Sequence, residues 1–328
     1  MTRKPSLKMK TTVGISGVAV LIAAVFLSCG DCAEQSQLTQ EKPRGFNSSN
    51  LALVNTQIGP VIPGLRQGAV PQGLTYDASS RRILISHYFE KLPSCVSILD
   101  GQSGRLISTV TLNEPSGKPH KGHAGGIAVA GKSLFVASDG RVLQYELSRF
   151  LNNSPPVSLN AKGTRQCETG SSFCTATSDL LLVGEFAHGS NYPTDPSHHL
   201  KDRKGVRKYA WVCGYRLTDA IGKPHCVLSI RQRVQGMCVW KNRVFLSVSY
   251  GRKNRSRIVV YKNPIGEPAH RNVELQGKTV PLWFLDGENY LGEIEFPPMS
   301  EGIVMIDGRL AVLSESGAEK YLTGGRGP

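Results

Sequence analysis

The stretch Gln235–Tyr250, which reads QGMCVWKNRVFLSVSY, decides the fold class because variants of it recur along the chain. Gly125–Ser138 reads GGIAVAGKSLFVAS and Glu301–Ser314 reads EGIVMIDGRLAVLS. Each copy has a small residue, an apolar strand, a short polar turn and a second apolar strand. Looser copies follow Gln72 and Ser172. The chain therefore repeats one β-hairpin five times.

The spacing of the hairpins indicates how they are arranged. Their leading small residues lie about 46 to 66 residues apart, which is the size of a whole supersecondary unit. Paired strands at such a period, with no helical stretch, are typical of a β-propeller, whose blades bury their faces against one another. We predict an all-β fold with one domain, a five-bladed β-propeller. Two alternatives stay open: a sixth blade within residues 257–298, and unrelated hairpins in a β-sandwich.

The remaining strands are predicted from shorter apolar runs. The expected strands of the first unit are 73–77, 82–88, 95–99 and 105–112. Third strands are expected at Arg141–Glu146 and Arg257–Tyr261, and a hairpin across Asp286–Asn289. Too few residues follow the last hairpin for two outer strands, so we expect Leu51–Asn55 to supply one and to close the ring.

The N-terminus resembles a secretory signal. Arg3, Lys4, Lys8 and Lys10 precede the apolar run Val13–Leu27, which is short for a membrane span. Cleavage is expected near Cys29, as in a lipoprotein, or after Gly30; an uncleaved anchor is the rival. We therefore predict a signal over residues 1–30, a flexible tether over 31–50 and the propeller over 51–328. The predicted location is secreted or periplasmic, with lipid anchoring to the cell envelope as a further option.

Export makes disulfides plausible. Six cysteines lie in the body of the chain, and Cys213 and Cys226 stand on either side of the turn-like segment 219–223, so we predict a cross-strand disulfide between these two. Cys174 and Cys238 occupy matching inner-strand positions and are expected to be buried free thiols. No Cys-x-x-Cys pair occurs in the body, which argues against structural zinc.

The chain is basic, with a formal net charge of +14, of which four charges belong to the N-terminal segment. Dense basic segments at Lys201–Lys208 and Arg252–Arg257 predict either a solvated surface or a surface that meets an anionic extracellular polymer, lipid headgroups or nucleic acid. Neither has the aromatic interleaving of single-strand nucleic-acid binders, so no specific nucleic acid is expected. A monomer is predicted, with membrane contact only through an N-terminal anchor or lipid.

The repeated Gln-Gly-Leu, Gly-Gly-Ile, Gln-Gly-Met and Glu-Gly-Ile openings resemble several propeller families. Residues 70–322 look like secreted bacterial propellers of unassigned activity. More remotely they resemble the glutamine cyclotransferases and the gluconolactonase and strictosidine synthase group. The first resemblance implies an acyltransferase with an aromatic pocket, whereas the second implies a calcium-dependent lactonase or esterase. Gln72-Gly73-Leu74 matches the cyclotransferase pattern, but Glu301-Gly302 lies in the last blade rather than where that family has its Glu-Gly.

Propeller geometry predicts where a site would lie. Inner strands start beside the axis, so the residues at their starts face the channel mouth. The predicted ligand-binding residues are Gln72, His123, Ser171, Gln235 and Glu301, with Gly125 as an alternative to His123. Glu301 is also the candidate catalytic residue and metal ligand, with calcium as the candidate cofactor. The loop Ala187–Arg207, rich in His and Asp, is the second candidate site.

Three functions follow as expectations. The favoured one is binding of a small molecule or extracellular polymer at the channel mouth. The alternatives are a calcium-dependent hydrolase and a glutamine cyclotransferase-like acyltransferase, so the sequence leaves open whether the protein is an enzyme. The Gly-x-Ser-x-Gly, His-Glu-x-x-His and phosphate-loop motifs are absent.

Overall fold

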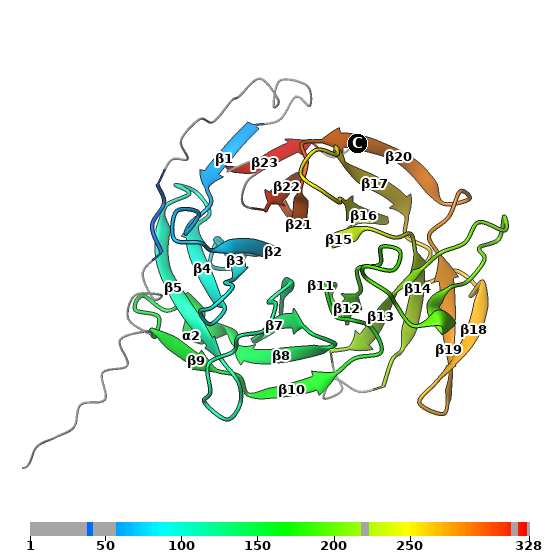
Figure 1. Cartoon of the computed structure of the whole chain (residues 1–328), viewed down its shortest axis with the longest axis horizontal. Helices are drawn as coiled ribbons and strands as arrows, with labels where there is room; N and C mark the ends of the chain where they lie inside the picture. Colours follow the sequence, from blue (N-terminus) through cyan, green and yellow to red (C-terminus); the bar gives the residue numbers. More distant parts are fainter. Residues whose placement is uncertain (1–37, 42–56, 218–222, 316–320, 327–328) are drawn as a thin grey trace, which may run out of the picture.

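The chain folds as a β-propeller in a computed structural model that describes residues 38–41, 57–217, 223–315 and 321–326. The strands form sheets that surround one axis as a ring (Figure 1). The predicted signal over residues 1–30 lies outside the described residues. None of the helices within the described ranges has the length and apolar character needed to cross a membrane.

The described strands form five sheets. From its inner to its outer strand, the first sheet consists of β2 (Val70–Asp77), β3 (Arg82–Tyr88), β4 (Cys95–Asp100), β5 (Leu106–Asn113) and β9 (Ser158–Asn160). In the same order, the second consists of β6 (Gly126–Ala130), β7 (Ser133–Ser138), β8 (Arg141–Glu146) and β10 (Gly163–Gln166). The helix α2 (Leu147–Leu151) follows β8.

The other three sheets continue the ring. The third is β11 (Phe173–Ala176), β12 (Leu180–Gly184), β13 (Ala210–Arg216), β14 (Cys226–Ile230), β19 (Lys278–Phe284) and β18 (Arg271–Leu275). The fourth is β15 (Val234–Trp240), β16 (Arg243–Val248), β17 (Ser256–Lys262) and β20 (Tyr290–Phe296). The fifth is β21 (Ser300–Ile306), β22 (Arg309–Ser314), β23 (Tyr321–Arg326) and β1 (Gln57–Val61). The short 3-10 helix η3 (Pro196–His198) lies between β12 and β13.

The inner strands β2, β6, β11, β15 and β21 contact one another in a closed circle, β21 meeting β2. Between each two neighbouring sheets lies a cluster of buried apolar side chains, with Leu84 and Ile127 between the first two and Cys238 and Ile303 between the last two. Apolar residues cover both faces of these strands, as the near-continuous apolar runs in the sequence predicted.

The leading glycines are explained by the closeness of the inner strands. A Cβ atom added to Gly126 would lie 2.5 Å from the backbone nitrogen of Cys174, and one added to Gly302 would lie 2.5 Å from that of Leu74. The third sheet has Phe173 at the start of its inner strand instead. In this sheet the glycine is Gly184, which lies on the neighbouring strand β12. Gly184 pairs with Phe173, and a Cβ on Gly184 would lie 2.1 Å from the Phe173 ring.

The two ends of the chain close the ring, as predicted, but the N-terminal strand lies later in the sequence than predicted. β1 pairs antiparallel with β23, so residues from both ends of the chain complete the fifth sheet (Figure 1). The closing strand is Gln57–Val61; the predicted segment Leu51–Asn55 lies outside the described residues. Part of the predicted tether packs on the propeller, since Leu38 is 5% exposed and Gln40 donates to the carbonyls of Val61 and Gly104.

Two predictions about the outer strands are wrong. β19 and β20 do not form a hairpin across Asp286–Asn289, because β19 pairs in parallel with β14 of the third sheet while β20 pairs with β17 of the fourth. Residues 257–298 are thus divided between two existing sheets, and the described residues contain no sixth sheet there. A blade hidden in that segment is excluded by the pairing.

The predicted disulfide is also wrong. Cys213 pairs in register with Val227, whereas Cys226 pairs with Gly214, one position along. Side chains one position apart point to opposite faces of a sheet. Cys226 therefore packs toward the fourth sheet and Cys213 toward the second, and all six cysteines of the described residues are free thiols. Cys174 and Cys238 are buried free thiols, as predicted.

Candidate functional site

A cavity of about 520 Å³ lies at the end of the ring where the inner strands begin, and we call it the mouth cavity. Its walls come from the starts of the inner strands and from the loops at the same end of the sheets. The lining residues are Gln72, Tyr88, His123, Asp139, Gly170, Ser171, Ser172, Phe186, Tyr192, Gln235, Tyr250, Gly251, Arg252, Met299, Glu301 and Glu315. This volume lies within the range of small-molecule sites.

The five side chains expected at the channel mouth all line this one cavity: Gln72, His123, Ser171, Gln235 and Glu301. The alternative Gly125 lies deeper, in the constriction below it. That constriction holds only about 10 Å³ among the leading glycines of the inner strands, room for at most one water molecule. The mouth cavity is therefore a pocket with a floor, and the axis carries no open channel beneath it.

Glu301 lies in that pocket with little contact with solvent, since it is 2% exposed. Its Oε1 accepts a hydrogen bond from Nε2 of Gln235 at 3.1 Å. Burial raises the pKa of the Glu301 carboxyl well above its usual range, and the nearby charge of Glu315 raises it further. Burial therefore favours the neutral carboxylic acid of Glu301, whose O–H group can donate.

A second acid of the pocket, Glu315, has no counterpart among the predicted residues. Burial also raises the pKa of Glu315, and the guanidinium of Arg252 opposes that rise. The two side chains approach to 4.0 Å between Nη2 of Arg252 and Oε1 of Glu315. Arg252 follows β16 and Glu315 follows β22. Both lie outside the repeated hairpin motif, so the repeat does not identify them.

His123 belongs to a second polar pair. Its Nε2 lies 2.7 Å from Oε1 of Gln72, and its ring lies 4.0 Å from that of Tyr88, centroid to centroid. Surrounding side chains lower the pKa of His123, although Asp139 opposes the shift. A neutral ring then donates from Nε2 to the amide oxygen. His123 is therefore bonded to Gln72.

One wall of the pocket is aromatic. The rings of Phe186 and Tyr192 meet edge to face at 5.1 Å, and those of Phe186 and Tyr250 stack at 6.4 Å. The guanidinium of Arg233 lies 5.5 Å from the Tyr250 ring. The resemblance to cyclotransferases implies an aromatic pocket, and tyrosine and phenylalanine rather than tryptophan form this wall. Such rings offer flat apolar surfaces to a ligand.

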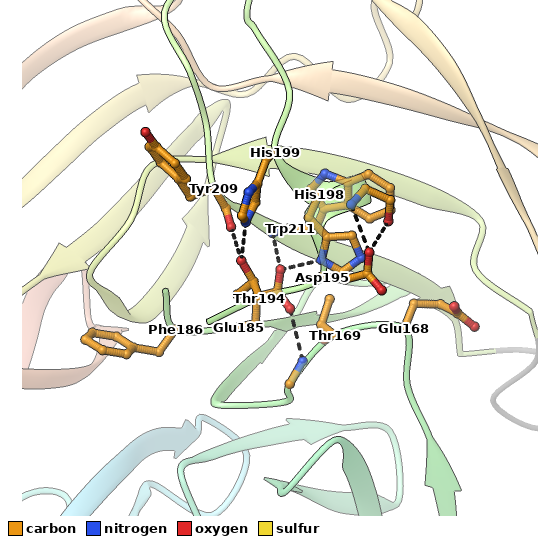
Figure 2. A network of polar contacts seen from close by, with 12 residues as sticks. Glu168, Thr169, Glu185, Phe186, Thr194, Asp195, His198, His199, Tyr209 and Trp211 are labelled. Carbon is orange, nitrogen blue, oxygen red and sulfur yellow. Dashed lines mark hydrogen bonds and ion pairs between the residues drawn. The ribbon is translucent and has the colours of Figure 1, made fainter. Parts of the chain in front are cut away.

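The loop Ala187–Arg207 supports the aromatic wall. Behind Phe186, the buried carboxylate of Glu185 accepts from Nδ1 of His198 at 2.6 Å and from the backbone nitrogens of Trp211 and Gly170 (Figure 2). The His198 ring stacks on that of Trp211 at 4.0 Å. These bonds tie the loop to the sheet and to Gly170 of the pocket. His198 is thus a structural residue of the wall.

The described residues do not fit a calcium site. Calcium takes six to eight oxygen ligands, several of them carboxylates. Among residues 38–41, 57–217, 223–315 and 321–326, no group of three or more His, Cys, Asp or Glu side chains could hold a metal ion. These side chains therefore do not support a calcium-dependent reaction.

The two basic segments are largely ion-paired. The pairs are Arg203–Asp286, Lys204–Glu288, Lys208–Asp202, Arg252–Glu315, Arg255–Glu295 and Arg257–Glu293. Neighbouring carboxylates thus offset much of the charge that the sequence suggested was available to an anionic polymer. Binding of such a polymer at these segments stays a prediction.

Comparisons with solved structures find proteins of low similarity to this chain. Hydrazine synthase of Kuenenia stuttgartiensis matches at 9% identity and a TM-score of 0.39, over 83% of this chain; this chain spans 58% of that one. Glutaminyl cyclase of Myxococcus xanthus matches at 8% identity and a TM-score of 0.44, over 78% of this chain and 90% of its own chain. A GH43_1 enzyme of Xanthomonas citri matches at 11% identity and a TM-score of 0.46, over 81% of this chain and 86% of its own chain.

No protein-family model matches the chain, and no curated protein matches its sequence. At such low identities, the likeness to solved structures carries no argument about activity. The function has to be inferred from the site itself.

Proposed function

We propose that this protein binds a small, uncharged polar molecule in the mouth cavity. The observation that carries the proposal is Glu301, a carboxyl that is 2% exposed in a cavity of about 520 Å³ and has an amide, not a cation, beside it. An acidic side chain is costly to bury unless it is neutral and its hydrogen bonds are satisfied. A ligand would accept from its O–H group, which the bond from Gln235 leaves free.

The rest of the pocket narrows the class of ligand. Around Glu301 lie the amides of Gln72 and Gln235 and the neutral ring of His123, which together offer donors and acceptors without charge. The aromatic wall of Phe186, Tyr192 and Tyr250 instead offers apolar ring faces to a ligand. We therefore expect a ligand with a flat apolar face and an edge of hydroxyl, ester or amide groups.

A panel of neutral sugars, lactones, peptides with N-terminal glutamine and cell-wall fragments tests the proposal by calorimetric titration. The Glu301→Ala variant should bind the best panel compound at least about tenfold more weakly, as expected for one lost hydrogen bond in a buried site. Glu90→Ala is the matched control, since Glu90 is an exposed acid at the same end of the ring but outside the cavity. It should bind as the parent does.

Glu301→Gln separates a binding role from a folding role. Its amide keeps a donor and an acceptor, so binding at pH 7 should stay close to that of the parent. The parent should lose affinity as the pH rises through the raised pKa of Glu301, whereas Glu301→Gln should not. If Glu301→Ala binds every compound as the parent does, the proposal is wrong.

The pair Glu301 and Glu315 favours a second candidate, acid–base catalysis in the same pocket. Both carboxyls have a raised pKa, which suits a group that exchanges a proton near neutral pH. Such a pair would serve the acyltransferase expected from the cyclotransferase resemblance, or a hydrolase that works without calcium. Lactone hydrolysis or pyroglutamate formation that is lost in both Glu301→Gln and Glu315→Gln would support it. Binding without turnover would leave the first proposal alone.

We further propose that each of the five sheets acts as one blade and that the pocket works outside the cytoplasm. The first statement is supported by the closed circle of five inner strands and by the apolar clusters between neighbouring sheets. The second is supported by the basic and apolar N-terminal segment. N-terminal sequencing of the product recovered outside the cell tests it, and retention of Met1 on a protein confined to the cytoplasm would contradict it.

A further inference from the structure

The turns that follow the inner strands lie at the end of the ring opposite the mouth cavity, because all five inner strands start at the cavity. We call this end the basal face. Three of the five turns carry an exposed cation, namely Arg81, Lys132 and Lys241, and the exposed Arg309 begins the strand after a fourth turn. Arg243 lies beside Lys241. The exposed acids of the same turns are Asp179 and Asp307, so the cations outnumber them.

The other acids near these turns are already engaged. Asp77 is buried and accepts from the hydroxyls of Ser79 and Ser80, and Asp100 pairs with Arg82. The basal face thus keeps a positive balance, unlike the ion-paired segments near the mouth. This pattern depends on the repeat, since each cation occupies a similar place in a different hairpin.

An apolar feature accompanies these charges. Trp240, Lys241, Arg243, Lys262 and Leu291 line a shallow groove of about 390 Å³ at the basal face. Leu291 is 54% exposed and the neighbouring Tyr290 is 46% exposed. Nζ of Lys241 lies 4.3 Å from the centre of the Trp240 ring, and Lys262 pairs with Glu267. Aromatic and aliphatic side chains flanked by cations suit the boundary between lipid headgroups and acyl chains.

We propose that the basal face docks on an anionic lipid bilayer, with Trp240 and Leu291 at the level of the headgroups. Each Lys or Arg near such a surface adds to the attraction, which salt weakens. An anionic polysaccharide would use the cations but gains little from exposed Leu291 and Tyr290, so the apolar residues favour the bilayer. Docked in this way, the mouth cavity would open away from the membrane.

Tryptophan fluorescence tests the proposal on the full chain. Trp211 and Trp283 are 2% and 7% exposed, and the chain has three tryptophans, so lipids brominated near the headgroup should quench Trp240 selectively. We expect quenching with vesicles of phosphatidylglycerol and phosphatidylcholine, weak quenching with phosphatidylcholine alone, and loss of the effect in Trp240→Phe. The N-terminal apolar segment carries no tryptophan, so its own insertion gives no signal.

Charge reversal provides the matched comparison. Lys132→Glu combined with Lys241→Glu should weaken binding to the anionic vesicles by about 30-fold or more, because each change removes an attraction and adds a repulsion. Lys91→Glu combined with Lys253→Glu changes the charge equally, at exposed positions on the mouth side, and should bind as the parent does. Equal binding by the two double variants would overturn the proposal. Binding to soluble alginate without binding to vesicles would do the same.

Discussion

At the scale of single residues, the polar side chain at the start of each inner strand is the most informative feature. These positions were predictable because propeller geometry places them beside the axis whatever the outer strands do. Glu315 and Arg252 were not predicted as site residues, because they follow β22 and β16, the second strands of their hairpins, and lie beyond the repeated motif. The cysteine pair failed for a similar reason, since a shift of one position in register decides which face each thiol occupies.

The raised pKa of Glu301 predicts how stability depends on pH. Its ordinary value is 4.5, and the folded value lies well above that. The neutral acid is favoured in the folded state, so its contribution is complete below pH 4.5 and is lost as the pH rises through the folded pKa. Glu301→Gln should therefore match the parent near pH 4 and exceed it by about 1–3 kcal/mol at high pH.

Urea denaturation of both proteins between pH 4 and 9 measures this difference. Glu90→Gln, an exposed acid, controls for the loss of one charge. A difference between parent and Glu301→Gln that stays constant over this range would show that folding does not raise the pKa of Glu301, contrary to our account.

At the scale of strands, the inner hairpins were predicted well because their apolar runs and turns are local signals. The outer strands were predicted poorly. β9 pairs with β5 although strands of the second sheet lie between them in the sequence. The hairpin β18–β19 joins the third sheet although strands of the fourth sheet precede it in the sequence. Such pairings depend on contacts far apart in the chain, so no short stretch of sequence specifies them.

The close packing of the inner strands predicts the effect of filling a leading glycine. Gly302→Ala should cost about 1–3 kcal/mol of the free energy of unfolding, since its Cβ would lie 2.5 Å from the Leu74 nitrogen and the backbone cannot move freely there. Gly163→Ala is the control, because no atom lies within 4 Å of its added Cβ and it is also in a strand. Thermal and urea unfolding measure both; an equal effect would contradict the packing of the inner strands.

At the scale of the whole molecule, the ring depends on the pairing of β1 with β23. Removing residues 321–328 takes away β23, which lies between β1 and β22 in the fifth sheet. The melting temperature should fall, and β22 should become an open edge prone to association. Removing only residues 327–328 is the control. Calorimetry and light scattering would check this prediction. Similar unfolding of both truncated proteins would show that the ring does not need this closure.

The two ends of the ring have different chemistry, which is a property of the molecule as a whole. The mouth end holds a polar pocket with a buried acid and an aromatic wall, and the basal end is basic with half-buried Trp240 and exposed Leu291. The repeat explains this difference, because every hairpin contributes its leading residue to one end and its turn to the other. Ligand binding and surface docking can therefore be tested separately.

The most direct test of the central claim is a crystal structure of the protein with the tightest compound from the panel. We predict that the compound occupies the mouth cavity, within hydrogen-bond distance of the Glu301 carboxyl and the Gln235 amide and against the rings of Tyr192 and Tyr250. Density for the compound on the outer loop Ala187–Arg207 or elsewhere, with the mouth cavity holding only water, would contradict it.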